Sequence, residues 1–154
     1  MMDSVKTPFP ECIAALCSNI KLDPHFADFY SWSRANNVPV IVLSSGMTPI
    51  IRGLLVHLLG PEANDIEIIS NDVEDRPGKK KEEEGGWQIK FHDDSHFGHD
   101  KSLAIRPYKN HFEEREREEK PTMLYAGDGV SDLSAAQETD LLFAKKGMGE
   151  LQPI

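Results

Sequence analysis

The sequence lacks a long apolar run and any segment of the kind that directs export. None of its apolar stretches approaches the ~20 residues needed to cross a bilayer. The opening residues, MMDSVKTPFPEC, hold no apolar core like that of a secretory signal. We therefore expect no membrane partner and a cytoplasmic location, with a nuclear location also open.

Cysteine and basic residues are both scarce. Cys12 and Cys17 are the only cysteines, and their spacing matches neither a zinc motif nor a C-x-x-C redox pair. We interpret them as buried thiols on a helix in a reducing compartment. Lysine and arginine total 17 against 26 aspartates and glutamates, which gives a net charge of −9. This charge argues against nucleic acid as a partner and favours cation binding.

The chain does contain apolar strands that alternate with amphipathic helices. Its 154 residues suit one domain, and its 39% hydrophobic content is typical of a globular protein. Continuous runs such as VPVIVLSSG suit strands buried on both faces, as in a parallel sheet. The alternation predicts an α/β fold. We expect helices over 11–20, 24–37, 48–59, 100–108 and 131–139. We expect buried strands over 38–46, 66–70 and 122–129, and a further strand over 140–147.

Local signals indicate where these elements begin and end. Asp23 is expected to cap a helix that starts at the following proline, and Thr48 to cap the helix that Gly60 ends. Residues 72–86 are expected to form a charged, solvated loop, with a strand over 87–93 returning from it. Four aromatic residues at helical spacing are expected to pack in the core: Phe26, Phe29, Tyr30 and Trp32.

Polar side chains gather at three places where a strand ends or a helix begins. Ser44 and Ser45 follow the apolar run VIVL, Lys101 begins a helix, and Asp128 and Asp132 follow the apolar run MLYA. In open α/β sheets, ligands bind at the carboxyl ends of the strands. Hydroxyls and a lysine suit phosphate oxygens, and carboxylates suit Mg²⁺, so the set predicts a site for phosphate and magnesium.

Three short segments together resemble motifs of the haloacid dehalogenase (HAD) superfamily. The segment VIVLSSG resembles the second motif through Ser44, and HDKSLAI resembles the third through Lys101. The segment GDGVSD closely resembles the fourth through Asp128 and Asp132. The segments LSSGMTPII and GHDKSLAI are similar to those of the phosphoserine-phosphatase-like branch of the superfamily, including its fungal members.

The resemblance implies a Rossmann-like, three-layer core and magnesium-dependent hydrolysis of phosphomonoesters. In the family an aspartate attacks phosphorus, a second aspartate two positions later shuttles protons, and water hydrolyses the aspartyl-phosphate. For this chain it implies Mg²⁺ at Asp128 and Asp132, and phosphate binding by Ser44, Ser45 and Lys101. It also implies catalytic roles for Lys101 and Asp132, and a small phosphorylated metabolite as the substrate.

The family's first motif, a strand followed by D-x-D-G-T, has no counterpart before Ser44. The aspartates in that part of the chain are Asp3, Asp23 and Asp28, and none has a second aspartate two positions later. The nucleophile and the general acid/base are therefore missing. The strand that carries them, which lies at the centre of the family's sheet, is missing as well.

These absences shape the expected organisation and activity. We expect residues 1–22 to be the remnant of a helical cap and 23–154 to be the core, with an insert at about 72–97. We expect no turnover, and we favour a sequence truncated at its N-terminus over a short protein without catalysis. The alternative is a phosphate- or metal-binding remnant, or one that binds proteins, which could associate with itself through an unpaired sheet edge.

Other classes of site fit the sequence less well. The segment HDDSHFGHD contains three histidines, His92, His96 and His99, among aspartates that include Asp94. Its spacing matches no metal motif, and a polar loop that contacts substrate through one side chain is the most we expect of it. Neither nucleotide-binding glycine motif is present. A receiver domain would carry its acidic pair after the first strand, whereas this pair lies late in the chain.

Overall fold

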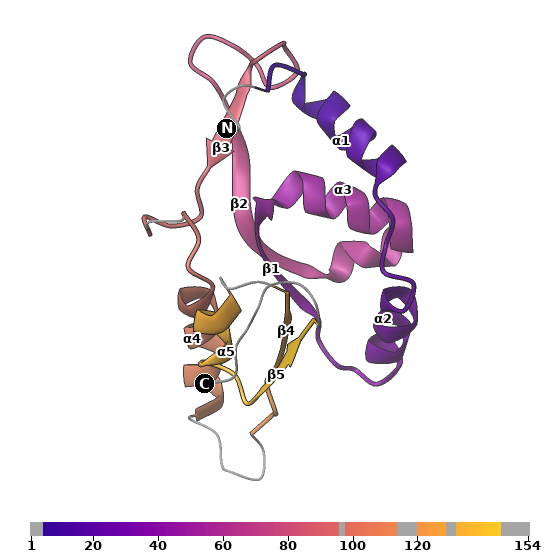
Figure 1. Cartoon of the computed structure of the whole chain (residues 1–154), viewed down its shortest axis with the longest axis vertical. Coiled ribbons are helices and arrows are strands. Elements are labelled where there is room, and N and C mark those ends of the chain that lie inside the picture. The colour runs from indigo at the N-terminus through magenta and orange to yellow at the C-terminus, as the bar shows by residue number, and fades with distance from the viewer. Residues whose placement is uncertain (1–4, 96–97, 114–119, 129–131, 146–154) are drawn as a thin grey trace. The chain divides into compact units, whose positions relative to one another are not determined.

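The computed structural model describes residues 5–95, 98–113, 120–128 and 132–145. The chain divides into two compact units, which comprise residues 1–99 and residues 100–154. Each unit combines helices with a pair of parallel strands (Figure 1). The predicted α/β class is therefore confirmed.

The boundary expected at residue 22 and the insert expected at 72–97 stay predictions. Among the described helices, none combines the length and the apolar character that a membrane crossing requires.

The first unit is built on a three-stranded sheet. Strand β1 (Ile41–Met47) runs parallel to β2 (Glu67–Asp75), and β2 pairs antiparallel with β3 (Trp87–Lys90). Helix α3 (Thr48–Leu59) and the 3-10 helix η2 (Pro61–Asp65) connect β1 to its parallel neighbour. Figure 1 shows β2 as the long central strand, which pairs with β1 along its first part and with β3 along its second part.

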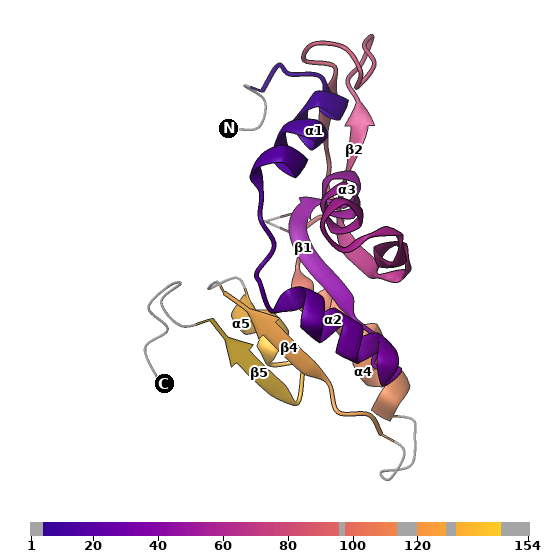
Figure 2. The same cartoon turned by 90° about the vertical axis from the view of Figure 1, so that its right-hand side faces the viewer.

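Two further helices, α1 (Phe9–Asn19) and α2 (Phe26–Ala35), pack in the same unit. Helix α1 lies against α3 (Figure 2), and the contact is close at Gly53. A Cβ atom at this position would lie 2.9 Å from Cγ2 of Ile13, so a larger residue would push the helices apart.

The core of the first unit comes in two apolar clusters. One lies where α2, α3 and η2 meet β2, and its buried members are Tyr30, Leu55, Ala63 and Ile66. The other is formed by Phe9, Met47 and Trp87, and the rings of Phe9 and Trp87 meet edge to face at 5.3 Å. Helices and loops therefore contribute more of these buried residues than the strands do.

The helix starts differ from the expected ones. Helix α2 begins at Phe26, because the residues before it form a turn in which the His25 N–H donates to Oδ1 of Asp23 at 3.2 Å. Asp23 therefore closes a turn and does not cap the helix. Thr48 is the first residue of α3, and its hydroxyl contacts Ser70 on β2 at 2.8 Å instead of capping its own helix. The end of α3 at Gly60, with φ of +97°, is confirmed.

The expected loop at 72–86 and the expected aromatic core are each partly wrong. Strand β2 continues to Asp75, because Val73 turns inward toward the Phe9 cluster while its charged neighbours face outward. Only the later part, before β3, is a loop. Phe29 and Trp32 are 46% and 55% exposed, and their rings stack on each other along the outer face of α2.

The second unit contains α4 (Lys101–Glu113), β4 (Leu124–Gly127), the single turn α5 (Leu133–Ala136) and β5 (Leu141–Ala144). Strands β4 and β5 are parallel. Asp100 caps α4 as expected, because its Oδ1 accepts hydrogen bonds from the backbone N–H and the hydroxyl of Ser102, at 2.9 and 2.8 Å.

Strand β4 is less buried than the sequence predicted, and its neighbour β5 is exposed. The β4–β5 register places Leu124 and Leu141 side by side, and Ala126 beside Phe143, on one face of the sheet. The two leucines and the phenylalanine are 59%, 52% and 60% exposed. Among the described residues of the second unit, no element covers this face of the small sheet, whereas a strand in a three-layer core would be covered on both faces.

Candidate functional site

A buried carboxylate organises the polar end of the second unit. The Asp132 side chain is only 8% exposed, and its Oδ1 accepts hydrogen bonds from Nζ of Lys101 at 2.5 Å and from the Tyr125 hydroxyl at 2.8 Å. Its Oδ2 accepts the backbone N–H of Asp128 at 3.0 Å. Three donors, one of them cationic, thus compensate a charge that would otherwise be costly to bury.

The glycine in the GDG segment makes this arrangement sterically feasible. A Cβ atom on Gly127 would lie 2.6 Å from the carboxylate carbon of Asp132, far inside van der Waals contact. The strand can therefore carry no side chain at the position where the carboxylate folds back over it. This steric requirement explains the residue directly before Asp128.

Tyr125 is a member of this network that the sequence did not reveal. Burial of the phenol, its hydrogen bond to Asp132 and the negative charges of Asp132 and Asp128 all raise the pKa of Tyr125 above its ordinary value. The hydroxyl therefore stays protonated at neutral pH and remains a donor. A tyrosine inside an apolar strand is typical of a core residue, and only the chain reversal from β4 to Asp132 brings the two side chains together.

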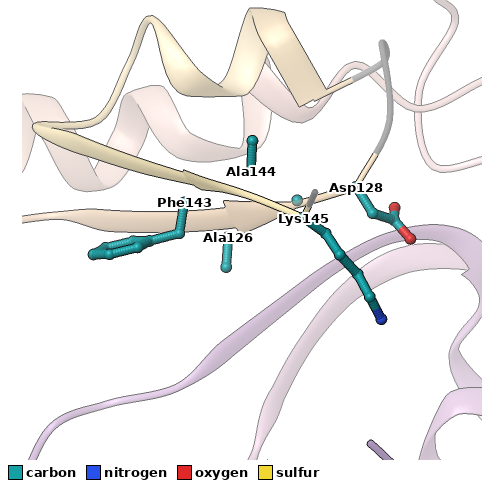
Figure 3. Close-up of a pocket in the computed structure, with 6 residues that line it drawn as sticks. Ala126, Asp128, Phe143, Ala144 and Lys145 are labelled. Atoms are coloured by element: carbon teal, nitrogen blue, oxygen red, sulfur yellow. The ribbon is translucent and has the colours of Figure 1, made fainter. Parts of the chain in front are cut away.

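Asp128 lies where β4 ends, and its side chain is exposed. It lines an open pocket of about 430 Å³ with Ala126, Gly127, Phe143, Ala144 and Lys145. Figure 3 shows the Asp128 and Lys145 side chains extending toward the same side, while Ala126 and Phe143 share one face of the sheet. The pocket thus has a charged end with both signs and an apolar wall.

Lys145 was also missed from the sequence. It follows β5, and its backbone N–H donates to the carbonyl of Gly127 at 3.0 Å, which extends the parallel ladder by one residue. This bond brings the lysine beside the end of β4. A lysine in the segment AKKG carries no signal of its own, because only the register of β5 against β4 brings Lys145 to the pocket.

The two predicted serines belong to the first unit. Ser44 is partly buried and Ser45 is exposed, at the end of β1 that precedes α3. The Ser44 hydroxyl accepts a hydrogen bond from the Gly46 N–H at 3.0 Å, which folds the turn back on the strand end. The structure thus brings Lys101, Asp128 and Asp132 together in the second unit, whereas Ser44 and Ser45 belong to the first unit.

The comparison with known proteins identifies the family. The sequence profile of haloacid dehalogenase-like hydrolases matches residues 1–137. The chain belongs to this family.

Two fungal relatives of the HAD chain share half of its residues. The protein named Pdp3-interacting factor 1 of Schizosaccharomyces pombe is 51% identical over 148 residues. The protein named polyol phosphate phosphatase PYP1 of Saccharomyces cerevisiae is 51% identical over 150 residues. Each alignment covers 96% of this chain and 60% of the relative's own length.

The residues of this HAD chain fit Mg²⁺ through one direct protein ligand. Among the described residues no group of three or more histidine, cysteine or acidic side chains could hold a metal ion, which argues against an all-protein cage there. Asp128 offers an exposed carboxylate beside the pocket. Mg²⁺ retains several waters and commonly binds one or two carboxylates together with substrate phosphate, so this donor set suits it.

The histidine-rich segment forms a separate cluster in the first unit. The His99 side chain is fully buried, its Nδ1 lies 3.9 Å from Oδ2 of Asp93, and its ring meets that of His92 edge to face at 4.8 Å. His96 lies outside the described residues. Asp94 is exposed, and its contact with substrate stays a prediction.

Proposed function

We propose that this chain carries the phosphate- and magnesium-binding part of a HAD phosphomonoester hydrolase. The observation that supports this most directly is the buried Asp132, whose carboxylate holds the Lys101 ammonium and the Asp128 backbone in fixed positions. Preorganised charges of this kind stabilise a phosphoryl group without reorganisation during the reaction.

Each predicted residue has a role in this proposal. Asp128 is the direct ligand of Mg²⁺, which when bound neutralises charge on the phosphate. Lys101 supplies a positive charge toward phosphoryl oxygens. Ser44 and Ser45 bind phosphate through hydroxyl and backbone donors. Asp132 acts through Lys101 and through Asp128, because three protein donors already occupy its two oxygens, and it contacts the metal ion at most through a water.

Binding without turnover is the expected behaviour of the chain by itself. The family's reaction requires an aspartate nucleophile and a second aspartate two positions later, and the sequence before Ser44 contains no such pair. The remaining groups can bind and orient a phosphate, yet none of them is an acceptor placed to form the aspartyl-phosphate.

The substrate class we propose is a small phosphorylated polyol. The printed name of the budding-yeast relative describes a phosphatase of polyol phosphates, and that protein is 51% identical to this chain. The pocket of about 430 Å³ beside Asp128 is of a size suited to a small metabolite. Its charged end can take the phosphate with its metal ion, while the carbon chain of a small substrate would lie along the apolar wall.

A protein-binding role is the second candidate. The printed name of the fission-yeast relative describes a factor that interacts with a protein called Pdp3. Such a role needs no nucleophile, so it is compatible with the missing aspartate pair.

The test is calorimetric titration of the 154-residue chain with inorganic phosphate, with and without Mg²⁺. We expect phosphate to bind in the presence of Mg²⁺ and Asp128→Asn to abolish the effect of the metal. Asp65→Asn is the matched control, because it also removes one exposed carboxylate and lies on η2 of the first unit. Absence of phosphate binding, or an equal loss in both variants, would refute the proposal.

A second assay tests turnover. Hydrolysis of p-nitrophenyl phosphate that depends on Mg²⁺ and disappears in Asp128→Asn would show that the chain is active by itself, against our expectation.

A further inference from the structure

The end of β1 leaves the regular ladder at the two positions that follow Ser44. Ser44 lies opposite Ser70 on β2, and the next pair is Met47 with Asn71, so two residues of β1 have no opposite residue on β2. These two, Ser45 and Gly46, bulge outward and are both exposed. A bulge of this kind re-aims the backbone groups that would otherwise continue the ladder.

The side chain of Asn71 holds this bulge. Asn71 is 2% exposed, and its Nδ2 donates to the carbonyl oxygen of Ser45 at 2.8 Å. Its Oδ1 accepts the backbone N–H of His92 at 2.9 Å. Because one partner can only accept and the other can only donate, the orientation of the amide is determined.

The bonds of Asn71 therefore join the bulge to the segment that follows β3. The His92 N–H also donates to the carbonyl of Gly98 at 3.1 Å, and this second hydrogen bond closes the loop between the two residues. Neighbouring polar contacts serve a different purpose. The hydroxyls of Thr48 and Ser70 contact each other and the backbone carbonyl of Asn71, which fixes the start of α3.

We propose that Asn71 is the positioning residue of the phosphate-binding turn at Ser44 and Ser45. This inference rests on the proposed function, since it concerns the same site. The turn is exposed, and its own contact from the Gly46 N–H to the Ser44 hydroxyl spans only two residues. The tertiary bond from Asn71 to Ser45 comes from a buried side chain that does not itself reach the surface.

The consequence for binding follows from conformational entropy. A turn that is already ordered does not have to be fixed by its ligand, whereas a loosened turn must be ordered at the expense of affinity. The conformational entropy lost when a ligand fixes the backbone of one or two residues is enough to weaken binding on the order of tenfold or more. Loss of the Asn71 amide should therefore weaken phosphate binding even though the residue touches no ligand.

The experiment compares Asn71→Ala with Ser70→Ala in the 154-residue chain. Both residues are buried neighbours on β2, both changes are neutral in charge, and both remove side-chain hydrogen bonds. Two quantities are measured: the affinity for inorganic phosphate in the presence of Mg²⁺, and amide hydrogen exchange at Gly46. If Asn71→Ala does not fold, Asn71→Gln takes its place, since it keeps the amide and moves it by one methylene.

We expect Asn71→Ala to weaken phosphate binding about tenfold and to accelerate exchange at Gly46, while Ser70→Ala lowers stability without either effect. If the two variants lose the same affinity, or if Asn71→Ala binds phosphate like the unaltered chain, the positioning role is refuted. Ser44→Ala separates this failure from that of the proposed function. If the unaltered chain binds no phosphate, or if Ser44→Ala has no effect, the proposed function fails, and the inference that rests on it fails with it.

Discussion

Replacing Tyr125 by phenylalanine would remove one of the three donors that hold the buried Asp132 carboxylate. The ring is 9% exposed and keeps its packing, so the change deletes the hydrogen bond at 2.8 Å and little else. A hydrogen bond to a charged acceptor contributes about 1.5–3 kcal/mol. Because Lys101 and the Asp128 N–H remain, we expect the lower part of this range, roughly 1.5–2 kcal/mol.

The assay must report on the second unit alone. Both tryptophans, Trp32 and Trp87, lie in the first unit, so tryptophan fluorescence is unsuited to this measurement. Native-state hydrogen exchange at the Asp128 and Lys145 amides reads the network directly, since these groups donate to Asp132 and to the end of β4. The expected loss corresponds to exchange faster by on the order of 10- to 30-fold.

Tyr30→Phe is the matched control for this experiment. Tyr30 is buried to a similar degree, but its hydroxyl donates to the neutral backbone carbonyl of Glu62 at 2.9 Å. Loss of such a bond should cost about 0.5–1.5 kcal/mol. Hydrogen exchange at amides of the first unit measures this loss. If Tyr125→Phe leaves exchange in the second unit unchanged, or costs less than Tyr30→Phe, the carboxylate network does not stabilise the unit as argued.

Three further outcomes are expected. Gly127→Ala should destabilise the second unit by about 1–3 kcal/mol in a hydrogen-exchange measurement, because its Cβ would collide with the carboxylate folded over it; unchanged exchange would contradict the steric argument. The backbone N–H of Lys81 and the nearby Lys80 ammonium lower the pKa of Asp75. The ionised Asp75 therefore stabilises the fold above the ordinary pKa of about 3.9, and this stabilisation is lost as the pH falls through the lower pKa of the folded state. Exchange at the Lys81 amide should therefore quicken only in acid, and quickening near neutral pH would refute this. Acrylamide should quench Trp32, which is 55% exposed, and spare Trp87, which is 3% exposed; equal quenching would contradict the outward-facing aromatic pair on α2.

The sequence predicted the family from residues whose chemical type and place, at a strand end or a helix start, both indicate the same function. The order of Ser44, Lys101, Asp128 and Asp132 along the chain predicted the family, and the profile match over residues 1–137 confirms it. The end of α3 was predictable for a separate reason, because Gly60 has a local backbone requirement that needs no knowledge of the rest of the fold.

Contacts that depend on register could not be predicted in this way. The place of Lys145 depends on the register of β5 against β4, that of Tyr125 in the network depends on the position of Asp132 beside β4, and the role of Asn71 depends on the bulge in β1 against β2. The end of β2 was missed for a related reason. One inward valine among three acidic residues hides the period-two pattern that indicates a strand, although Val73 packs against the Phe9 cluster.

Hydrogen bonds that join residues 7–9 to Lys81 and to the first residue of β3 have a consequence for protein synthesis. The Phe9 N–H donates to the carbonyl of Lys81 at 2.8 Å, and the carbonyl of Thr7 accepts the indole N–H of Trp87 at 2.9 Å. Helix α1 has only 11 residues, too few to be stable by itself in water. A ribosome needs roughly 4–16 s to make the residues that separate these partners. The Phe9 cluster is thus completed only when β3 has been made, and during that interval a chaperone or another chain would meet Phe9 without its Trp87 partner.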